Sequence, residues 1–217
     1  MISKQKYIFL KGEADAWFKR NCKTFEKTDF RQDEICLLVT DICESYNCQL
    51  RILEVGCSGG DRLKFLSDIL NCEVHGIDPS EMAVGRCRAN NINALVGTAD
   101  HLPYEDSFFD ILIFGFCLYL CDRDDLFKIV SEANRVLKDE GWVIIKDFYA
   151  KQPMKRFYQH ADEVYSYKMD YASLFTCHPN YVNYHQQLFH HKSLKMTDSS
   201  DDWVAVSAIR KLDGLGS

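Results

Sequence analysis

The sequence predicts an α/β protein in which helices cover both faces of a mostly parallel sheet and an antiparallel hairpin lies at one sheet edge. Three observations predict this class. Short apolar runs alternate with segments of helical periodicity between residues 50 and 150. The run Phe109–Phe114 is apolar nearly throughout, which is typical of a strand buried on both faces. Two candidate strands near the C-terminus, 187–191 and 203–209, have no helical segment between them.

The first half of the chain supplies helices and strands in alternation. A helix is expected where apolar residues recur at i, i+3, i+4 and i+7: Ile35, Leu38, Val39 and Ile42. Asn47 ends this helix, and the strand Arg51–Val55 follows it. A second helix is predicted by the same spacing at Leu63, Leu66, Ile69 and Leu70. The strand Glu73–Ile77 comes next, and Ser80 is the expected N-cap of a helix over Glu81–Asn90.

The second half continues the alternation. Ala94–Val96 is the third expected strand and Phe109–Phe114 the fourth. Another amphipathic helix is predicted by the apolar positions Leu126, Ile129, Val130, Ala133 and Leu137. A turn at Asp139–Gly141 separates it from the fifth strand, Trp142–Ile145. With the two C-terminal strands this makes seven strands.

Composition narrows the class of protein. The chain has 217 residues, 47% of them hydrophobic, and a formal net charge of −6. That charge argues against a dedicated binder of nucleic acid or of an anionic membrane. No apolar run approaches a membrane span, and Met1–Leu10 does not resemble a signal peptide. The ten cysteines contain no Cys-x-x-Cys pair, so reduced thiols in a cytoplasmic protein are expected.

A small-residue loop follows the first strand, in Glu54–Gly60, and opens a helix. Glycines at such a point let a ligand approach the backbone and its amides. Asp78 ends the second strand, where an acid accepts hydrogen bonds from ribose hydroxyls, and Asp100 follows the third strand, where it can receive an adenine amino group. A nicotinamide-dependent oxidoreductase would need Gly-x-Gly-x-x-Gly, whereas Ser58 and Asp61 stand at two of the glycine positions.

These motifs resemble the class I S-adenosylmethionine-dependent methyltransferases, close to the type 11 methyltransferase domain. Glu54, Gly56 and Gly60 match the Glu-x-Gly-x-Gly-x-Gly motif, with Ser58 in place of the middle glycine. The segments 137–142 and 115–120 also match family motifs. The resemblance implies a Rossmann-like fold, S-adenosylmethionine as cofactor and S-adenosylhomocysteine as product. It implies cofactor contacts from Glu54, Gly56, Cys57, Ser58, Gly60, Asp78, Pro79, Ala99, Asp100, His101 and Gly115, and from Trp17 and Arg20 of an N-terminal helix over the cofactor.

The chain is expected to form one domain, since it has only four prolines and no linker-like stretch. Its expected parts are an N-terminal helical cap (1–48), a cofactor-binding core (50–150), a substrate-side segment (149–191) and an edge hairpin (187–210). Seven of the eleven tyrosines and five of the seven histidines lie between Tyr149 and His191. Such side chains suit a pocket for a polar small molecule. His160 is the candidate general base, and the candidate substrate contacts are Tyr119, Tyr165, Tyr167, Lys168 and Tyr171.

The function expected is methyl transfer to a small-molecule acceptor by in-line displacement, to a hydroxyl or carboxyl oxygen of a sugar, glycan precursor or secondary metabolite. The alternatives are a cofactor-binding partner protein without its own catalysis, and an N-methyltransferase. No Asn-Pro-Pro-Tyr-type tetrapeptide follows the fourth strand, which disfavours amine acceptors and nucleic acid. Adjacent histidines such as His190 and His191 point to opposite faces of a strand, so no metal site is expected. Neither membrane nor nucleic-acid partners are expected, and the oligomeric state stays open.

Overall fold

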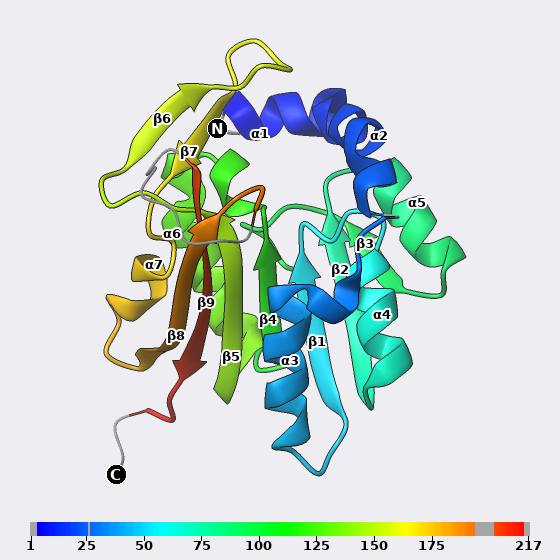
Figure 1. Cartoon of the computed structure of the whole chain (residues 1–217), viewed down its shortest axis with the longest axis vertical. Helices are drawn as coiled ribbons and strands as arrows, with labels where there is room; N and C mark the ends of the chain where they lie inside the picture. The colour runs from blue at the N-terminus through cyan, green and yellow to red at the C-terminus, as the bar shows by residue number, and fades with distance from the viewer. Residues whose placement is uncertain (1–3, 26, 194–201, 215–217) are drawn as a thin grey trace.

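A seven-stranded sheet with the order β3-β2-β1-β4-β5-β9-β8 forms the centre of the molecule (Figure 1). The computed structural model describes residues 4–25, 27–193 and 202–214. Neighbours from β3 to β5 pair in parallel, whereas β9 pairs antiparallel with both β5 and β8. This confirms the predicted fold class. The strands are β1 (Leu50–Val55), β2 (Cys72–Asp78), β3 (Asn93–Val96), β4 (Phe109–Gly115), β5 (Leu137–Phe148), β8 (Tyr181–His190) and β9 (Trp203–Lys211).

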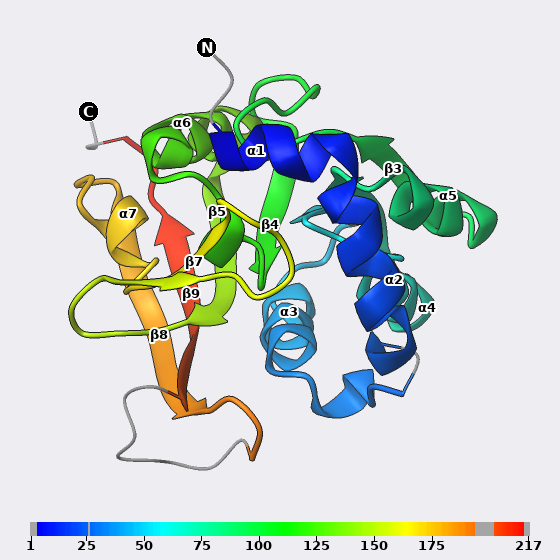
Figure 2. The same cartoon turned by 90° about the horizontal axis from the view of Figure 1, so that it is seen from above.

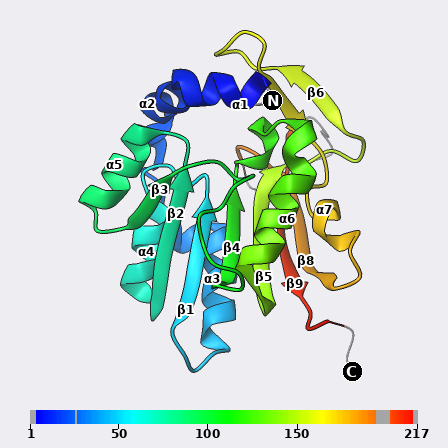
Figure 3. The ribbon, with the colours of Figure 1, turned by 180° about the vertical axis from the view of Figure 1, so that it is seen from behind.

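Helices cover both faces of the sheet because each of them has one apolar stripe to bury. The helices α3 (Glu34–Glu44) and α4 (Asp61–Ile69) pack on the face seen in Figure 1. The helices α6 (Leu126–Val136) and α7 (Ser173–Thr176) pack on the opposite face, seen in Figure 3. The predicted cap of α5 (Glu81–Ala89) is present, since Ser80 Oγ accepts a hydrogen bond from the Ala83 amide at 3.0 Å.

The main differences from the prediction are two strand boundaries and one additional hairpin. The strand β5 begins at Leu137, because the expected turn at Asp139–Gly141 is an irregularity within the β4–β5 pairing, with Glu140 at φ 60°. The strand β8 begins at Tyr181, since it follows β9 over its full length. An antiparallel hairpin that the sequence did not predict, β6 (Met154–Phe157) and β7 (Tyr165–Lys168), forms a second sheet. The connection 194–201 between β8 and β9 lies outside the described residues.

The N-terminal segment crosses the end of the sheet at which the parallel strands finish (Figures 1 and 2). It consists of α1 (Lys4–Ile8), a π-helical turn (Phe9–Glu13) and α2 (Ala14–Phe25), and we call it the N-terminal cap. Its direction changes at Gly12, whose φ of 142° is outside the helical range. The cap is fastened to the β6–β7 hairpin by the Gln5 side chain, which donates to the Tyr165 carbonyl and accepts from its amide.

Candidate active site

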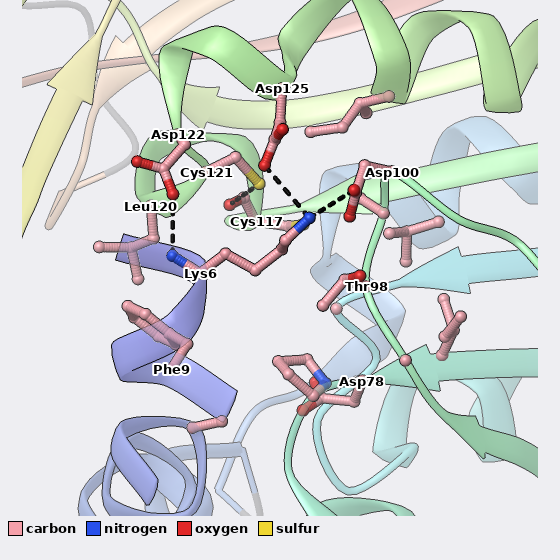
Figure 4. Close-up of a pocket in the computed structure, with 18 of the residues that line it drawn as sticks. Lys6, Phe9, Asp78, Thr98, Asp100, Cys117, Leu120, Cys121, Asp122 and Asp125 are labelled. Atoms are coloured by element: carbon pink, nitrogen blue, oxygen red, sulfur yellow. Dashed lines mark hydrogen bonds and ion pairs between the residues drawn. The ribbon is translucent and has the colours of Figure 1, made fainter. Parts of the chain in front are cut away.

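A cavity lies between the N-terminal cap and the carboxyl ends of the parallel strands. Ligands of open α/β sheets bind at this position, because the loops that follow neighbouring strands meet there. Its lining comes from the cap, from the ends of β1 and β2, and from the loops after β3 and β4 (Figure 4). Polar side chains that line it include Lys6, Asp78, Thr98, Asp100, Asp122 and Asp125.

The glycine loop is held tightly against the end of β2. The amides of Gly56 and Cys57 both donate to the Ile77 carbonyl, at 2.8 and 3.2 Å. Gly56 has a φ of +77°, and a Cβ on it would lie 2.9 Å from the Cys117 Cβ. A side chain is therefore excluded there both by backbone conformation and by space. Gly60 has a φ of +76° and caps the N-terminus of α4.

Asp78 is placed at the floor of the cavity by the end of β2. Its carboxylate accepts hydrogen bonds from the backbone amides of Ser58, at 2.9 Å, and Ser80, at 2.8 Å. Burial raises the pKa of Asp78 to about 6, against the lowering effect of these amides. The carboxylate therefore favours a ligand that donates further hydrogen bonds to its charged form.

Asp100 lines the same cavity after β3 and is paired with the cap. Its Oδ2 is 2.5 Å from the Lys6 Nζ and 3.5 Å from the Lys128 Nζ. Burial would raise the pKa of Asp100, but the Lys6 ammonium and the Thr98 hydroxyl, which both hydrogen-bond the carboxylate, together hold that pKa below its usual value. Lys6 also lies 3.4 Å from Asp125, so a cation sits between two carboxylates in the cavity wall (Figure 4).

A smaller cavity lies between the glycine loop and the first turn of α4. Glu54, 2% exposed, lies in its wall, and its Oε1 accepts a hydrogen bond from Arg62. Arg62 also donates to Asp33 at 3.1 Å, and Asp33 is 3.1 Å from Lys146 Nζ. Burial raises the pKa of Glu54 to about 7 despite Arg62, whereas Arg62 and Lys146 lower the pKa of Asp33 against the effect of its burial.

Two buried polar atoms beside the glycine loop have no hydrogen-bond partner among the described residues. They are the Oε2 atom of Glu54 and the Oγ atom of Ser58. Leaving a buried polar group unpaired costs free energy, so such atoms indicate that a ligand completes the site. An ammonium group would pair with Glu54, and ribose hydroxyls would donate to Asp78. The residues present therefore fit a nucleoside that carries an amino-acid chain, such as S-adenosylmethionine.

Most of the expected cofactor residues lie at these two cavities. Asp78, Pro79, Ala99 and Asp100 line the larger one, Glu54, Cys57, Ser58 and Gly115 line the smaller one, and Gly56 and Trp17 line both. Three expected residues line neither cavity. Gly60 serves as a helix cap, the His101 side chain is exposed, and Arg20 pairs with Glu13 and Tyr158 at the outer side of the cap.

The structure does not bring the expected substrate residues to the cavity lining. Tyr171 is 3% exposed and belongs to the core, where its hydroxyl donates to the Tyr167 carbonyl at 3.0 Å. Arg123 stacks on Tyr167, with 4.1 Å between the guanidinium carbon and the ring centre. Lys168 lies over the Phe148 ring, and the Tyr165 backbone binds Gln5 of the cap.

Tyr119 and His160 complete the expected set. The Tyr119 hydroxyl accepts a hydrogen bond from Trp17 Nε1 at 3.4 Å, so Tyr119 touches a residue of both cavities. His160 is exposed in the connection between β6 and β7, with its ring 5.2 Å from that of Tyr158. The structure does not place His160 at the cavity, because residues 154–168 fold as a hairpin with His160 in its turn.

Sequence reasoning missed the residues that the cap and the loop after β4 contribute. They are Lys6, Phe9, Ala14, Cys117, Leu120, Cys121, Asp122 and Asp125. The acidic run Asp122–Asp125 is a signal that could have been used, because it follows a buried strand of the parallel sheet. Lys6 carries no such signal, since its place depends on how the cap crosses the sheet.

Two further findings concern the described part of the chain. It contains no group of three or more His, Cys, Asp or Glu side chains arranged to hold a metal ion. None of its helices combines the length and the apolar character that crossing a membrane requires.

The comparisons with known proteins find methyltransferases. Residues 53–145 match the family model described as a methyltransferase domain. A demethylmenaquinone methyltransferase of Staphylococcus haemolyticus is 32% identical over 122 residues, which cover 53% of this chain and 49% of that protein. An uncharacterized methyltransferase of Bacillus subtilis, YcgJ, is 27% identical over 146 residues, which cover 62% of this chain and 55% of that protein. The chain thus spans about half the length of the curated relatives it matches.

Solved structures extend the likeness over nearly the whole chain. The 1,6-didemethyltoxoflavin-N1-methyltransferase of Burkholderia thailandensis, with bound substrate and S-adenosylhomocysteine, has a TM-score of 0.70 at 14% identity and covers 98% of this chain and 92% of its own. A chain from the complex between the Haloferax volcanii Trm112 methyltransferase activator and a putative methyltransferase has a TM-score of 0.68 at 17% identity, covering 96% and 99%. At these identities the likeness concerns the fold. Residues 53–145 thus match a methyltransferase domain, and nearly the whole chain shares the fold of solved methyltransferases.

Proposed function

We propose that this protein transfers a methyl group from S-adenosylmethionine to a small-molecule acceptor. The observation that carries the proposal is the set of acids around the cavity. Asp78 and the unpartnered Glu54 Oε2 are buried at the glycine loop, and Asp100 lines the larger cavity beside β3. Each of these acids corresponds to one donor group of the cofactor: the ribose hydroxyls, the amino group and the adenine amine.

The chain's own residues bind the cofactor, orient it toward the acceptor and exclude water from the site. When bound, the cofactor supplies a methyl group that is already activated by a sulfonium charge. Asp78 and Glu54 hold the nucleoside and amino acid ends from fixed strand termini, which sets the line of attack. The N-terminal cap covers the site with Phe9, Ala14 and Trp17, so water is kept from the reacting atoms.

Aromatic side chains favour a planar acceptor. Phe116 and Trp17 line the larger cavity, and Tyr119 touches Trp17. Phe148 packs on both Phe116 and Tyr119, with ring centres 5.3 and 5.0 Å apart. Flat rings stack on such walls, whereas a sugar would require more polar side chains. We therefore place a planar secondary metabolite, methylated on a hydroxyl oxygen, ahead of a sugar or glycan precursor.

Methylation of a ring carbon is the second candidate. Several of the relatives are demethylmenaquinone methyltransferases, which favours a quinone-like acceptor. Their matched segments cover 39% to 49% of their own lengths. Both candidates share a planar acceptor with an ionisable hydroxyl, and they differ in the atom that is methylated.

Two measurements test the proposal. Isothermal titration of the protein with S-adenosylhomocysteine should show one site per chain, and NAD should show none. Incubation with methyl-labelled S-adenosylmethionine and a panel of phenols, hydroquinones and sugars should label a phenol or hydroquinone, and mass spectrometry of the product locates the methyl on oxygen or carbon. NAD binding, or binding of neither nucleoside, would refute the methyltransferase. Tight S-adenosylhomocysteine binding without methyl transfer to any acceptor of the panel would support a non-catalytic partner protein.

A further inference from the structure

Lys6 occupies the side of the cavity at which the cofactor's adenine is expected. Its ammonium lies 2.5 Å from Asp100 Oδ2 and 3.4 Å from Asp125 Oδ2 (Figure 4). The Lys6 side chain is 19% exposed and that of Asp100 is 5% exposed, so the ion pair is largely removed from water. Lys6, Asp100 and Asp125 all line the larger cavity.

The Oδ2 atom of Asp100 already accepts from a cation without a ligand. Lys128 reaches the same Oδ2 atom at 3.5 Å, and the Thr98 side chain also hydrogen-bonds the carboxylate. A neutral adenine amine donates a weaker hydrogen bond to a carboxylate than an ammonium does. The adenine amine would therefore have to displace a stronger hydrogen-bond donor, the Lys6 ammonium, from Asp100.

The position of Lys6 is fixed by the contacts of its own helix. Its backbone amide donates to Asp122 Oδ2 at 2.8 Å. The neighbouring Gln5, 3% exposed, donates to the Leu120 carbonyl at 2.6 Å and binds the Tyr165 backbone. These contacts hold the first turn of α1 over the loop after β4, so the ammonium points into the cavity and not into solvent.

We propose that Lys6 is an affinity-determining residue that competes with the cofactor's adenine amine for Asp100. Binding of the cofactor then requires the Lys6–Asp100 ion pair to separate, with Asp125 as the remaining partner of the ammonium. The inference rests on the proposed function, because it takes Asp100 as the adenine acceptor. The competitor is thus a side chain of the protein itself, and we call this competition of Lys6 for Asp100 the gate.

The test is the affinity for S-adenosylhomocysteine, measured by isothermal titration on the full chain. Lys6→Met removes the competing charge and keeps the side-chain length, so the Kd should fall about fivefold to tenfold. Lys6→Arg keeps the cation and should restore an affinity close to that of the wild type. Lys11→Met is the matched control, because Lys11 is exposed on the same segment, lies over the Tyr7 ring and lines neither cavity.

A second arm needs no variant and stays informative if Lys6→Met does not fold. The Lys6 side chain keeps 19% of its surface exposed, so salt screens part of the ion pair, and raising KCl from about 0.05 to about 0.5 M should tighten binding to the wild type. Lys6→Met should lack this salt effect.

An unchanged or higher Kd in a folded Lys6→Met protein would overturn the gate and leave the proposed function standing. The same holds if salt weakens binding to the wild type. A wild type and a Lys6→Met variant that both fail to bind the nucleoside would refute the proposed function itself. Binding by Lys6→Met alone would be the strongest support for the gate.

Discussion

Replacing Asp78 by Asn tests how the site recognises a nucleoside. In the wild type, each ribose hydroxyl that donates to the buried carboxylate forms a charge-assisted hydrogen bond, with a net value of about 1.5–3 kcal/mol. Asn keeps the shape, but it has one oxygen and a donor NH₂ group. That NH₂ group would face the amide of either Ser58 or Ser80, both of which now donate to Asp78. We expect a loss of about 3 kcal/mol, or about 100-fold in the Kd for S-adenosylhomocysteine.

The stability of the fold should change little in Asp78→Asn, because removing the buried charge offsets the cost of the one backbone amide that loses its acceptor. Burial raises the pKa of Asp78 from 3.8 to about 6, so folding disfavours the charged form of this group. Its contribution to stability is thus fully present below pH 3.8 and is lost as the pH rises through about 6. A neutral amide avoids that loss. Thermal unfolding, followed by circular dichroism, checks that the variant is folded before its affinity is measured.

The pH dependence of nucleoside binding has the opposite sign to that of the contribution of Asp78 to stability. Ribose hydroxyls donate to the ionised carboxylate, so the affinity of the wild type should fall as the pH drops below about 6. The slope reaches about tenfold per pH unit for a single group. Asp78→Asn should lack this component. A folded Asp78→Asn protein whose Kd lies within about fivefold of the wild type would refute the assignment of Asp78 to the ribose.

Three other substitutions probe the buried charges, the glycine loop and the hairpin. Arg62→Met leaves the carboxylates of Glu54 and Asp33 buried without their shared cation. Urea denaturation should therefore show a free energy of unfolding lower by about 3–5 kcal/mol. A decrease below about 1 kcal/mol would contradict a stabilising role of this network. Gly56→Ala forces a Cβ to within 2.9 Å of Cys117 at a φ of +77°. It should lower the free energy of unfolding by about 2 kcal/mol and abolish nucleoside binding. Gly85→Ala is the control, because the space at its Cβ is open, and it should not destabilise the protein. His160→Gln changes an exposed side chain outside the cavity, so labelled-methyl transfer should stay within about twofold of the wild type, and a large loss would restore His160 as the candidate base.

Local patterns were sufficient for the elements that build the cofactor half. The apolar run of β4, the stripe of α3 and the Ser80 cap all appear where the sequence predicts them, because each depends on neighbours within a few residues. The glycine loop was predictable for the same reason. A strand followed by small residues and a helix start leaves few backbone conformations, and Gly56 adopts one that other residues rarely adopt.

The sequence by itself therefore determined the fold class, the glycine loop and the acids at the strand ends, Glu54, Asp78 and Asp100. Only the tertiary structure decided what faces those acids. Residues 154–168 contain histidine and tyrosines, but their folding as a separate hairpin leaves His160 exposed. Lys6 lies 94 positions from Asp100 in the chain, and no local pattern pairs them. The physical reason is that strand termini are positioned by short-range periodicity, whereas the cap and the hairpin are positioned by contacts between distant segments, such as that between Gln5 and Tyr165.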